Sequence, residues 1–130
     1  MAGTVTITHY EVGLVRRIQV DWVADAADGS VPATALPSIE GRLLALVTNP
    51  GGTAPTDNYD ITLPSGEGDD RLQGVGANRD TANTEAAPIV YAGTSLHPWV
   101  DGDETLTFTL ANNAVNSATG RAVLYYTPAP

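Results

Sequence analysis

The chain has 130 residues, of which 15 are acidic and six are basic, so its formal net charge at pH 7 is −9. All six basic residues are arginines, and the sequence contains neither lysine nor cysteine. This length suits one compact domain covering residues 1–130. The composition excludes disulfides, zinc sites built on sulfur, and the basic patches that bind nucleic acid or anionic membranes.

The first two predicted strands alternate apolar residues with polar ones, a period that places successive side chains on opposite faces of a sheet. Thr4–Tyr10 reads TVTITHY, in which threonines alternate with two apolar residues and a histidine. Leu14–Asp25 is the second strand, and its alternation directs Ile18, Val20 and Trp22 toward the core. Both segments therefore predict half-buried strands.

The third predicted strand, Ile39–Thr48, carries apolar residues on both faces, namely Leu43, Leu44, Leu46 and Val47. A helix is the alternative for such a run. A strand is favoured because NPGG follows at once and because the neighbouring segments alternate. Apolar residues on both faces predict a central strand, or one covered by a second layer.

The rest of the chain consists of short apolar runs separated by turn-rich sequence. Between Gly74 and Gly93 the alternation is lost, which predicts one long irregular loop. The remaining predicted strands are Asn58–Leu63, Arg71–Leu72, Ile89–Tyr91, Leu96–Val100, Thr105–Leu110 and Arg121–Thr127. We therefore predict an all-β fold, a single-domain β-sandwich or jelly roll of about eight short strands with that one long loop.

Calcium takes oxygen ligands, which two acidic clusters could supply: Glu67, Asp69 and Asp70, and Asp101, Asp103 and Glu104. Neither cluster has the ligand and glycine spacing of an EF-hand loop. Both lie in sequence that favours turns, and DGDE is explained by a hairpin turn. We therefore predict solvated turns, no metal site and no cofactor.

Three partial motifs are typical of enzymes, and each lacks an essential feature. GTSLH has His97 where a nucleophile elbow needs glycine, and only His9 remains to act as a base. GVGANR lacks the third glycine and the βαβ frame of a dinucleotide site. Asp57 and Asp60, a candidate glycosidase pair, lie in a turn sequence. We predict that the chain is not an enzyme.

Arg16 and Arg17 hold a third of the positive charge, and on a strand they point to opposite faces. For at least one of them an ion pair with a carboxylate of the chain is the favoured interpretation, and a contact with a partner protein is the alternative. The alternation around Trp22 predicts a core position. Trp99, beside a proline and before an acidic turn, is expected on a half-buried rim or as an exposed interface anchor.

The block LLALVTNPGGTAPTDNYDITLPSGEGDDRLQGVGANRDTANTE, with the preceding RRIQVDWVAD, resembles a group of small virion structural proteins of tailed bacteriophages. In that group a strand ends in VTNPG and is followed by APTDNYDITL, an acidic hairpin and a GANRDTANTE-like segment. The resemblance covers roughly half of the chain. It implies a head decoration (cement) protein on the outer capsid surface, with a tail or head–tail connector component as the alternative.

On this resemblance we expect the partner to be the lattice of the major capsid protein and the protein to self-associate as a homotrimer. We expect synthesis in the host cytoplasm and a final location on the virion exterior, since the sequence lacks a secretion leader and a long apolar run. Lattice recognition is expected from the irregular Gly74–Tyr91 segment, and secondarily from the N-terminal strand. The predicted interface residues are Arg16, Arg17, Arg79, Tyr91 and Trp99.

A host-surface or carbohydrate-binding module is the alternative outside the virion. It is favoured by the predicted sandwich and by four aromatic side chains, Tyr59, Tyr91, Trp99 and Tyr125. An enzyme would instead require a pocket with convergent polar groups.

Overall fold

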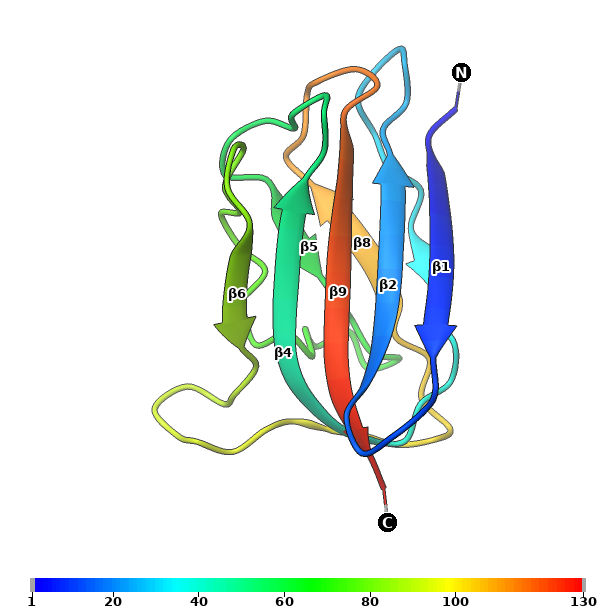
Figure 1. The fold of residues 1–130 in the computed structure, drawn as a ribbon, viewed down its shortest axis with the longest axis vertical. Helices are drawn as coiled ribbons and strands as arrows, with labels where there is room; N and C mark the ends of the chain where they lie inside the picture. Colours follow the sequence, from blue (N-terminus) through cyan, green and yellow to red (C-terminus); the bar gives the residue numbers. More distant parts are fainter. Residues whose placement is uncertain (1, 130) are drawn as a thin grey trace.

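The computed structural model describes residues 2–129, which form nine strands and no helix. The strands pair into a six-stranded sheet and a three-stranded sheet, and the smaller sheet lies behind the larger one in Figure 1. The strands are β1 (Thr4–Tyr10), β2 (Arg16–Val23), β3 (Thr34–Ala35), β4 (Gly41–Pro50), β5 (Asp60–Thr62), β6 (Glu85–Pro88), β7 (Trp99–Val100), β8 (Thr107–Ala111) and β9 (Thr119–Pro128). The predicted all-β single domain is confirmed.

The strand order is that of a jelly roll. The larger sheet has the order β1-β2-β9-β4-β6, with β7 pairing the start of β4, and the smaller sheet has the order β3-β8-β5. All pairs are antiparallel, and β2 with β9, β3 with β8 and β4 with β7 form a nested set. A long hairpin rolled into two layers produces this nesting, which is the double-sheet jelly-roll arrangement.

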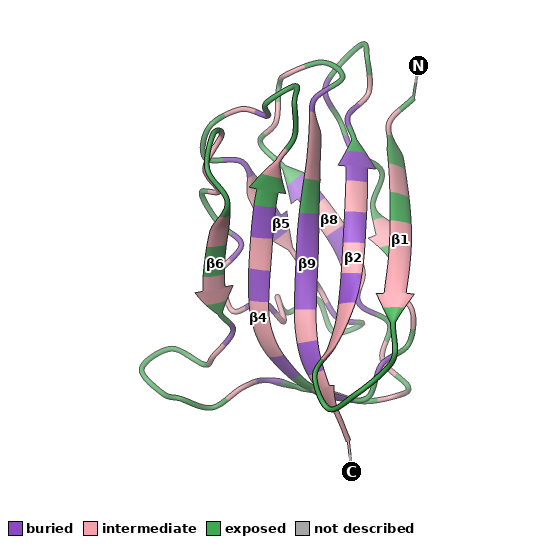
Figure 2. Cartoon of the chain, in the orientation of Figure 1, coloured by how far each residue is buried: buried purple, intermediate pink, exposed green. Residues whose placement is uncertain are grey.

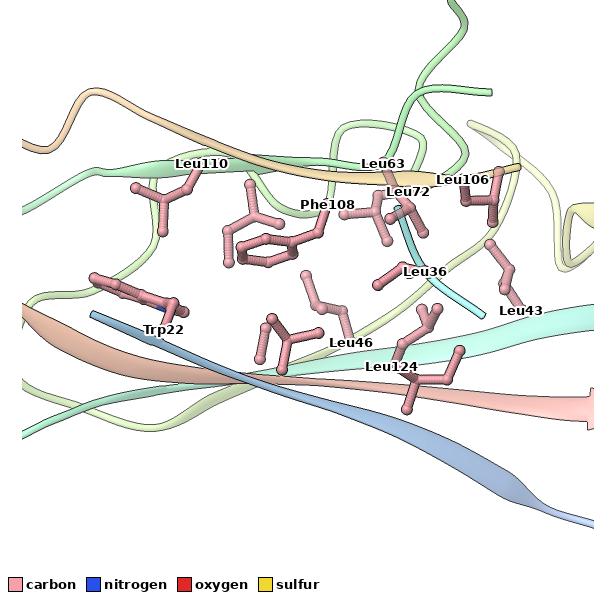
Figure 3. Close-up of a cluster of buried hydrophobic side chains, with 14 of the residues drawn as sticks. Trp22, Leu36, Leu43, Leu46, Leu63, Leu72, Leu106, Phe108, Leu110 and Leu124 are labelled. Carbon is pink, nitrogen blue, oxygen red and sulfur yellow. The ribbon is translucent and has the colours of Figure 1, made fainter. Parts of the chain in front are cut away.

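The core fills the space between the two sheets. The predicted inner face of β2 is confirmed, because Ile18, Val20 and Trp22 are at most 2% exposed. Figure 2 shows buried residues alternating along β2, as a period of two requires. In Figure 3 Phe108 of the smaller sheet and Leu124 of the larger sheet both point into the space between the layers.

The two-faced apolar pattern of the third predicted strand has its origin in a β-bulge. The pairing of β4 with β9 shifts register between Leu43 and Ala45, so Leu44 is an extra residue. Leu43 and Leu46 therefore both point inward although they are three residues apart, and both are buried. The preference for a strand over a helix is confirmed, and β4 lies centrally, between β9 on one side and β6 and β7 on the other.

Two short predicted strands are wrong. The segment that pairs with β4 is Glu85–Pro88, and Ile89–Tyr91 is irregular. The ladder ends there because the last bond, from the Ile89 N–H to the Leu44 carbonyl at 2.9 Å, reaches the bulge. Arg71–Leu72 lies in a run of turns. The long irregular connection exists, but it spans residues 63–84 between β5 and β6.

Trp22 is accommodated by a glycine on the neighbouring strand. Gly120 pairs with Trp22 in the β2–β9 ladder. A Cβ atom at position 120 would lie 2.3 Å from a carbon of the indole ring. Only glycine leaves room for the tryptophan in this conformation, so the two residues form a matched pair in the core.

Candidate functional site: the hairpin end of the sandwich

Exposed large apolar side chains gather at one end of the molecule. This end, called the hairpin end below, consists of the β1–β2 turn (residues 10–17) and the β6–β7 connection (residues 89–99), which lie at the bottom of Figure 1, the first below β1 and β2 and the second below β6. Figure 2 colours most of both loops as exposed. Of the eight exposed large hydrophobic residues among residues 2–129, seven lie here: Tyr10, Val12, Leu14, Val15, Tyr91, Leu96 and Trp99.

The β1–β2 turn presents its apolar side chains directly to solvent. Gly13 adopts φ of 92°, a conformation that favours glycine, and its carbonyl accepts a hydrogen bond from Nε of Arg16 at 3.1 Å. This local structure leaves Val12 89% exposed and Leu14 85% exposed. Fully burying one such side chain against a partner contributes about 1.5–3 kcal/mol. The turn is therefore suited to insertion into another protein.

The sequence prediction did not include these turn residues as interface residues. The signal was present, because VGLV places three apolar residues around a glycine at a point where the chain reverses. Turns are normally polar, so apolar residues at a reversal indicate a contact outside the chain. The prediction assigned Leu14 to the start of a strand, whereas β2 begins at Arg16.

Arg17 lies on the outer face of the larger sheet between two tyrosines. The ladder places it level with Tyr10 on one side and Tyr125 on the other, and its guanidinium carbon lies 4.2 Å from the centre of the Tyr10 ring. Its Nε atom is buried and makes no hydrogen bond within the described residues. The side chain is thus held in an aromatic frame.

The expected ion pair of Arg16 or Arg17 is not found. No carboxylate oxygen of residues 2–129 lies within 4.0 Å of either guanidinium. Arg16 bonds instead to the Gly13 carbonyl, and Arg17 stacks on Tyr10. Glu11, the carboxylate in the turn, lies instead 3.2 Å from Nδ1 of His9.

Arg42 and Trp99 form a second cation–aromatic pair at the same end. β7 brings Trp99 opposite Arg42, and the guanidinium carbon lies 4.1 Å from the ring centroid. Trp99 is nevertheless 51% exposed, so one part of the indole remains open to solvent. Trp99 therefore lies at the surface of the hairpin end, and Trp22, as predicted, lies in the core.

The other arginines stabilise the fold. Each lies within ion-pair distance of a carboxylate: Arg71 with Asp69 and Glu104, Arg79 with Glu85, and Arg121 with Asp21. Burial acts to raise the pKa of Asp21, but hydrogen bonds from Arg121 and Gln19 hold that pKa below its usual value. Within the described part of the chain, the arginines without a carboxylate partner are therefore Arg16 and Arg17 of the hairpin end, and Arg42, which stacks on Trp99 of that end.

The structure separates Arg79 from the other predicted interface residues. Its backbone bridges to Tyr59, with the Arg79 N–H 2.8 Å from the Tyr59 carbonyl, and its side chain is only 13% exposed. Tyr91 lies at the hairpin end, where its N–H donates to the Leu96 carbonyl at 2.9 Å. Arg16, Arg17, Tyr91 and Trp99 are thus brought to one end of the molecule, and Arg79 fastens the long irregular connection.

The acidic clusters lie in turns, and their carboxylates bond within the fold. Asp70 accepts backbone N–H groups from both sides of its turn, including that of Leu72 at 3.0 Å. A hydrogen bond from the Ser65 hydroxyl is the main cause that lowers the pKa of Asp69. The Arg71 guanidinium contacts both Asp69 and Glu104, and so links the two clusters. Within residues 2–129, no three His, Cys, Asp or Glu side chains are grouped so that they could hold a metal ion.

Each of the two histidines forms a hydrogen-bond contact with a group of the β-sandwich itself. Nε2 of His9 lies 2.5 Å from the Tyr126 hydroxyl, and Nδ1 of His97 lies 2.7 Å from the Ile89 carbonyl. The GTSLH sequence thus forms part of an exposed loop in which His97 helps to fix the backbone. These contacts give the two histidines structural roles in the fold.

A comparison with protein-family models, with curated proteins and with solved structures finds no match for this chain. No helix that could cross a bilayer occurs in residues 2–129. The function is therefore inferred from the surface of the molecule and from the resemblance of its central block.

Proposed function

We propose that this chain is a head decoration protein of a tailed bacteriophage that binds the outer surface of the assembled capsid through its hairpin end. The observation that carries the proposal is the concentration of seven exposed apolar side chains and three arginines without carboxylate partners at one end of residues 2–129. Aromatic residues and arginine surrounded by apolar contacts are the usual anchors of protein interfaces.

The block spanning residues 43–85 supports the choice of partner, because it resembles phage virion proteins. Jelly rolls also build viral capsid domains, which supports the proposal by analogy of fold. The net charge of −9 favours solubility of the protein before it binds the capsid.

The proposed activity is mechanical. A single hairpin end presents a small contact, and weak contacts become firm when many copies act on one lattice. Copies that span neighbouring capsomers raise the force needed to separate them. This mechanism requires no cofactor and no chemical step.

The test locates the protein in virions. Phage particles are produced from cells that carry the gene and are banded on a density gradient. Mass spectrometry of the band is expected to detect this chain in many copies per particle, and an antibody is expected to label heads. Absence of the chain from banded particles would overturn the proposal. Label confined to tails or to the head–tail junction would replace it with the tail or connector alternative.

A glycan array tests the carbohydrate-binding alternative. The Arg42 guanidinium covers one face of Trp99, which removes half of the platform that a sugar ring would stack on. We therefore expect no glycan binding by the isolated protein. Binding that is lost in Trp99→Ala would favour the alternative.

A further inference from the structure

β1 is an unguarded sheet edge. The two edges of the larger sheet are β1 and β6. β6 has four residues and ends in Pro88, features that discourage further pairing. β1 has seven residues, pairs with β2 without a register shift, and contains no proline, glycine, Asp, Glu, Lys or Arg. Natural sheets usually protect an edge of this length.

The outer side of β1 is not paired by the described chain. Its ladder runs to β2 over all seven residues, and none of the loop and turn backbone hydrogen bonds involves residues 4–10. In an antiparallel pair alternate residues direct their N–H and C=O groups to the neighbouring strand, and the residues between them direct theirs away. A row of backbone donors and acceptors therefore faces outward along β1, at the right-hand side of Figure 1.

We propose that this edge binds β1 of a second copy of the chain, antiparallel and about a two-fold axis at Ile7. The two larger sheets then become one continuous sheet. Thr6 lies opposite the partner's Thr8, and Ile7 lies opposite the partner's Ile7. This inference is independent of the proposed function.

The register follows from the faces of β1. Val5, Ile7 and His9 are partly buried on the inner face, so pairing must keep these positions together. An axis at Ile7 places Val5 opposite the partner's His9 and threonine opposite threonine on the outer face. Cross-strand threonine pairs and pairs of β-branched residues are favourable. A two-fold pairing of one surface with itself is also the commonest way in which soluble proteins dimerise.

The absence of charge along β1 makes the edge compatible with a second copy of this acidic chain. A chain of net charge −9 repels its own kind wherever acidic residues meet. β1 carries none of the 15 acidic residues, and in this register the next residue, Glu11, falls opposite the partner's Gly3. The edge is thus a place where two copies can meet without setting like charges directly opposite each other.

Sedimentation equilibrium of the purified full chain tests the pairing. The expected mass is about 27 kDa, twice the 13.5 kDa of one chain. The double variant Thr6→Lys with Thr8→Lys sets two pairs of like charges opposite each other and is expected to weaken the dimer about tenfold or more. Thr6→Lys with Thr8→Glu sets opposite charges face to face and is expected to restore it. If overall net charge alone controlled association, the Thr6→Lys/Thr8→Lys variant would dimerise more tightly than the parent, because it is less acidic.

Thr84→Lys with Ala86→Lys is the matched control on the opposite edge, since both positions are exposed and two residues apart. It is expected to leave the dimer intact, and circular dichroism shows that each variant is folded. A monomer or a trimer in the parent chain would overturn the proposal, and a trimer would agree with the expectation from the phage resemblance. A folded Thr6→Lys/Thr8→Glu variant that stays monomeric would overturn the register.

Discussion

At the scale of single residues, Tyr59 couples stability to alkaline pH. The side chain is fully buried and its ring centroid lies 5.8 Å from that of Trp22. Burial raises its pKa to about 12, although the nearby Thr48 hydroxyl acts to lower it. The folded state therefore favours the protonated phenol more strongly than the unfolded chain does.

Stability is expected to fall as the pH rises from about 10 to about 12. Because the folded pKa of Tyr59 lies above the unfolded value, its contribution is complete below pH 10 and is lost as the pH passes through about 12. Urea midpoints measured across this range check the prediction. Tyr59→Phe should flatten the profile, and Tyr91→Phe, at an exposed position, should leave it unchanged. If the urea midpoint of Tyr59→Phe fell with pH as steeply as that of the parent, Tyr59 would not be the source of the pH dependence.

Gly120 is required by Trp22, and its replacement measures this match. Gly120→Ala places a methyl group 2.3 Å from the indole, so the ring or the strand must move. We expect a loss of about 1–3 kcal/mol in the free energy of unfolding, the usual cost of overpacking. Gly52→Ala is the control, because no atom lies within 4 Å of a Cβ there. Thermal or urea unfolding measures the stability of both variants. Equal stability of the two would contradict the requirement for glycine at position 120.

At the scale of elements, the sequence predicts those strands in which one face is covered and the other is not. β1 was predicted with the bounds that the structure has, and the inner face of β2 was predicted residue by residue. β6 reads EAAP and has no alternation, because this strand takes its position from its pairing with β4 and not from its own pattern. A local pattern therefore does not reveal a strand that is specified by its neighbour.

The predicted interface residues also divide into those that local sequence reveals and one whose role depends on contacts made by the folded chain. Arg16, Arg17 and Trp99 were predicted from unusual local sequence, and all three lie at the hairpin end. Arg79 was predicted as an anchor of the irregular Gly74–Tyr91 segment, but its role depends on Tyr59 and Glu85, and the Tyr59 contact is distant in sequence. That contact exists only after the long connection has folded against β5.

The bulge in β4 allows a deletion that the regular strands do not allow. Removing Leu44 leaves Leu43 and Leu46 on the inner face, because the extra residue is lost and simple alternation returns. We expect a folded variant that is less stable by about 1–3 kcal/mol. Removing Gln19 from β2 instead turns one half of that strand inside out, and we expect no folded protein. Solubility and circular dichroism compare the two deletions, and similar outcomes would contradict the role given to the bulge.

At the scale of the whole molecule, the two ends of the sandwich differ in chemistry. The loops at the end opposite the hairpin end are fastened by polar bonds, such as that from the Asn113 side chain to the Gly29 carbonyl at 2.8 Å. The hairpin end instead leaves apolar side chains exposed. Antiparallel pairing through β1 would direct the two hairpin ends of a dimer to opposite ends of the joined sheet.

Docking and folding should therefore be separable. Val12→Ser with Leu14→Ser removes apolar surface that contacts nothing in the core, so the free energy of unfolding is expected to change by no more than about 0.5 kcal/mol. The same change is expected to weaken binding to purified phage heads at least about tenfold, since two anchor residues are lost. Val23→Ser, at the exposed apolar residue outside the hairpin end, is the control and should bind as the parent does. Co-sedimentation with heads measures both variants. Binding that survives in the turn variant, or fails in the Val23 control, would place the docking surface elsewhere on the molecule.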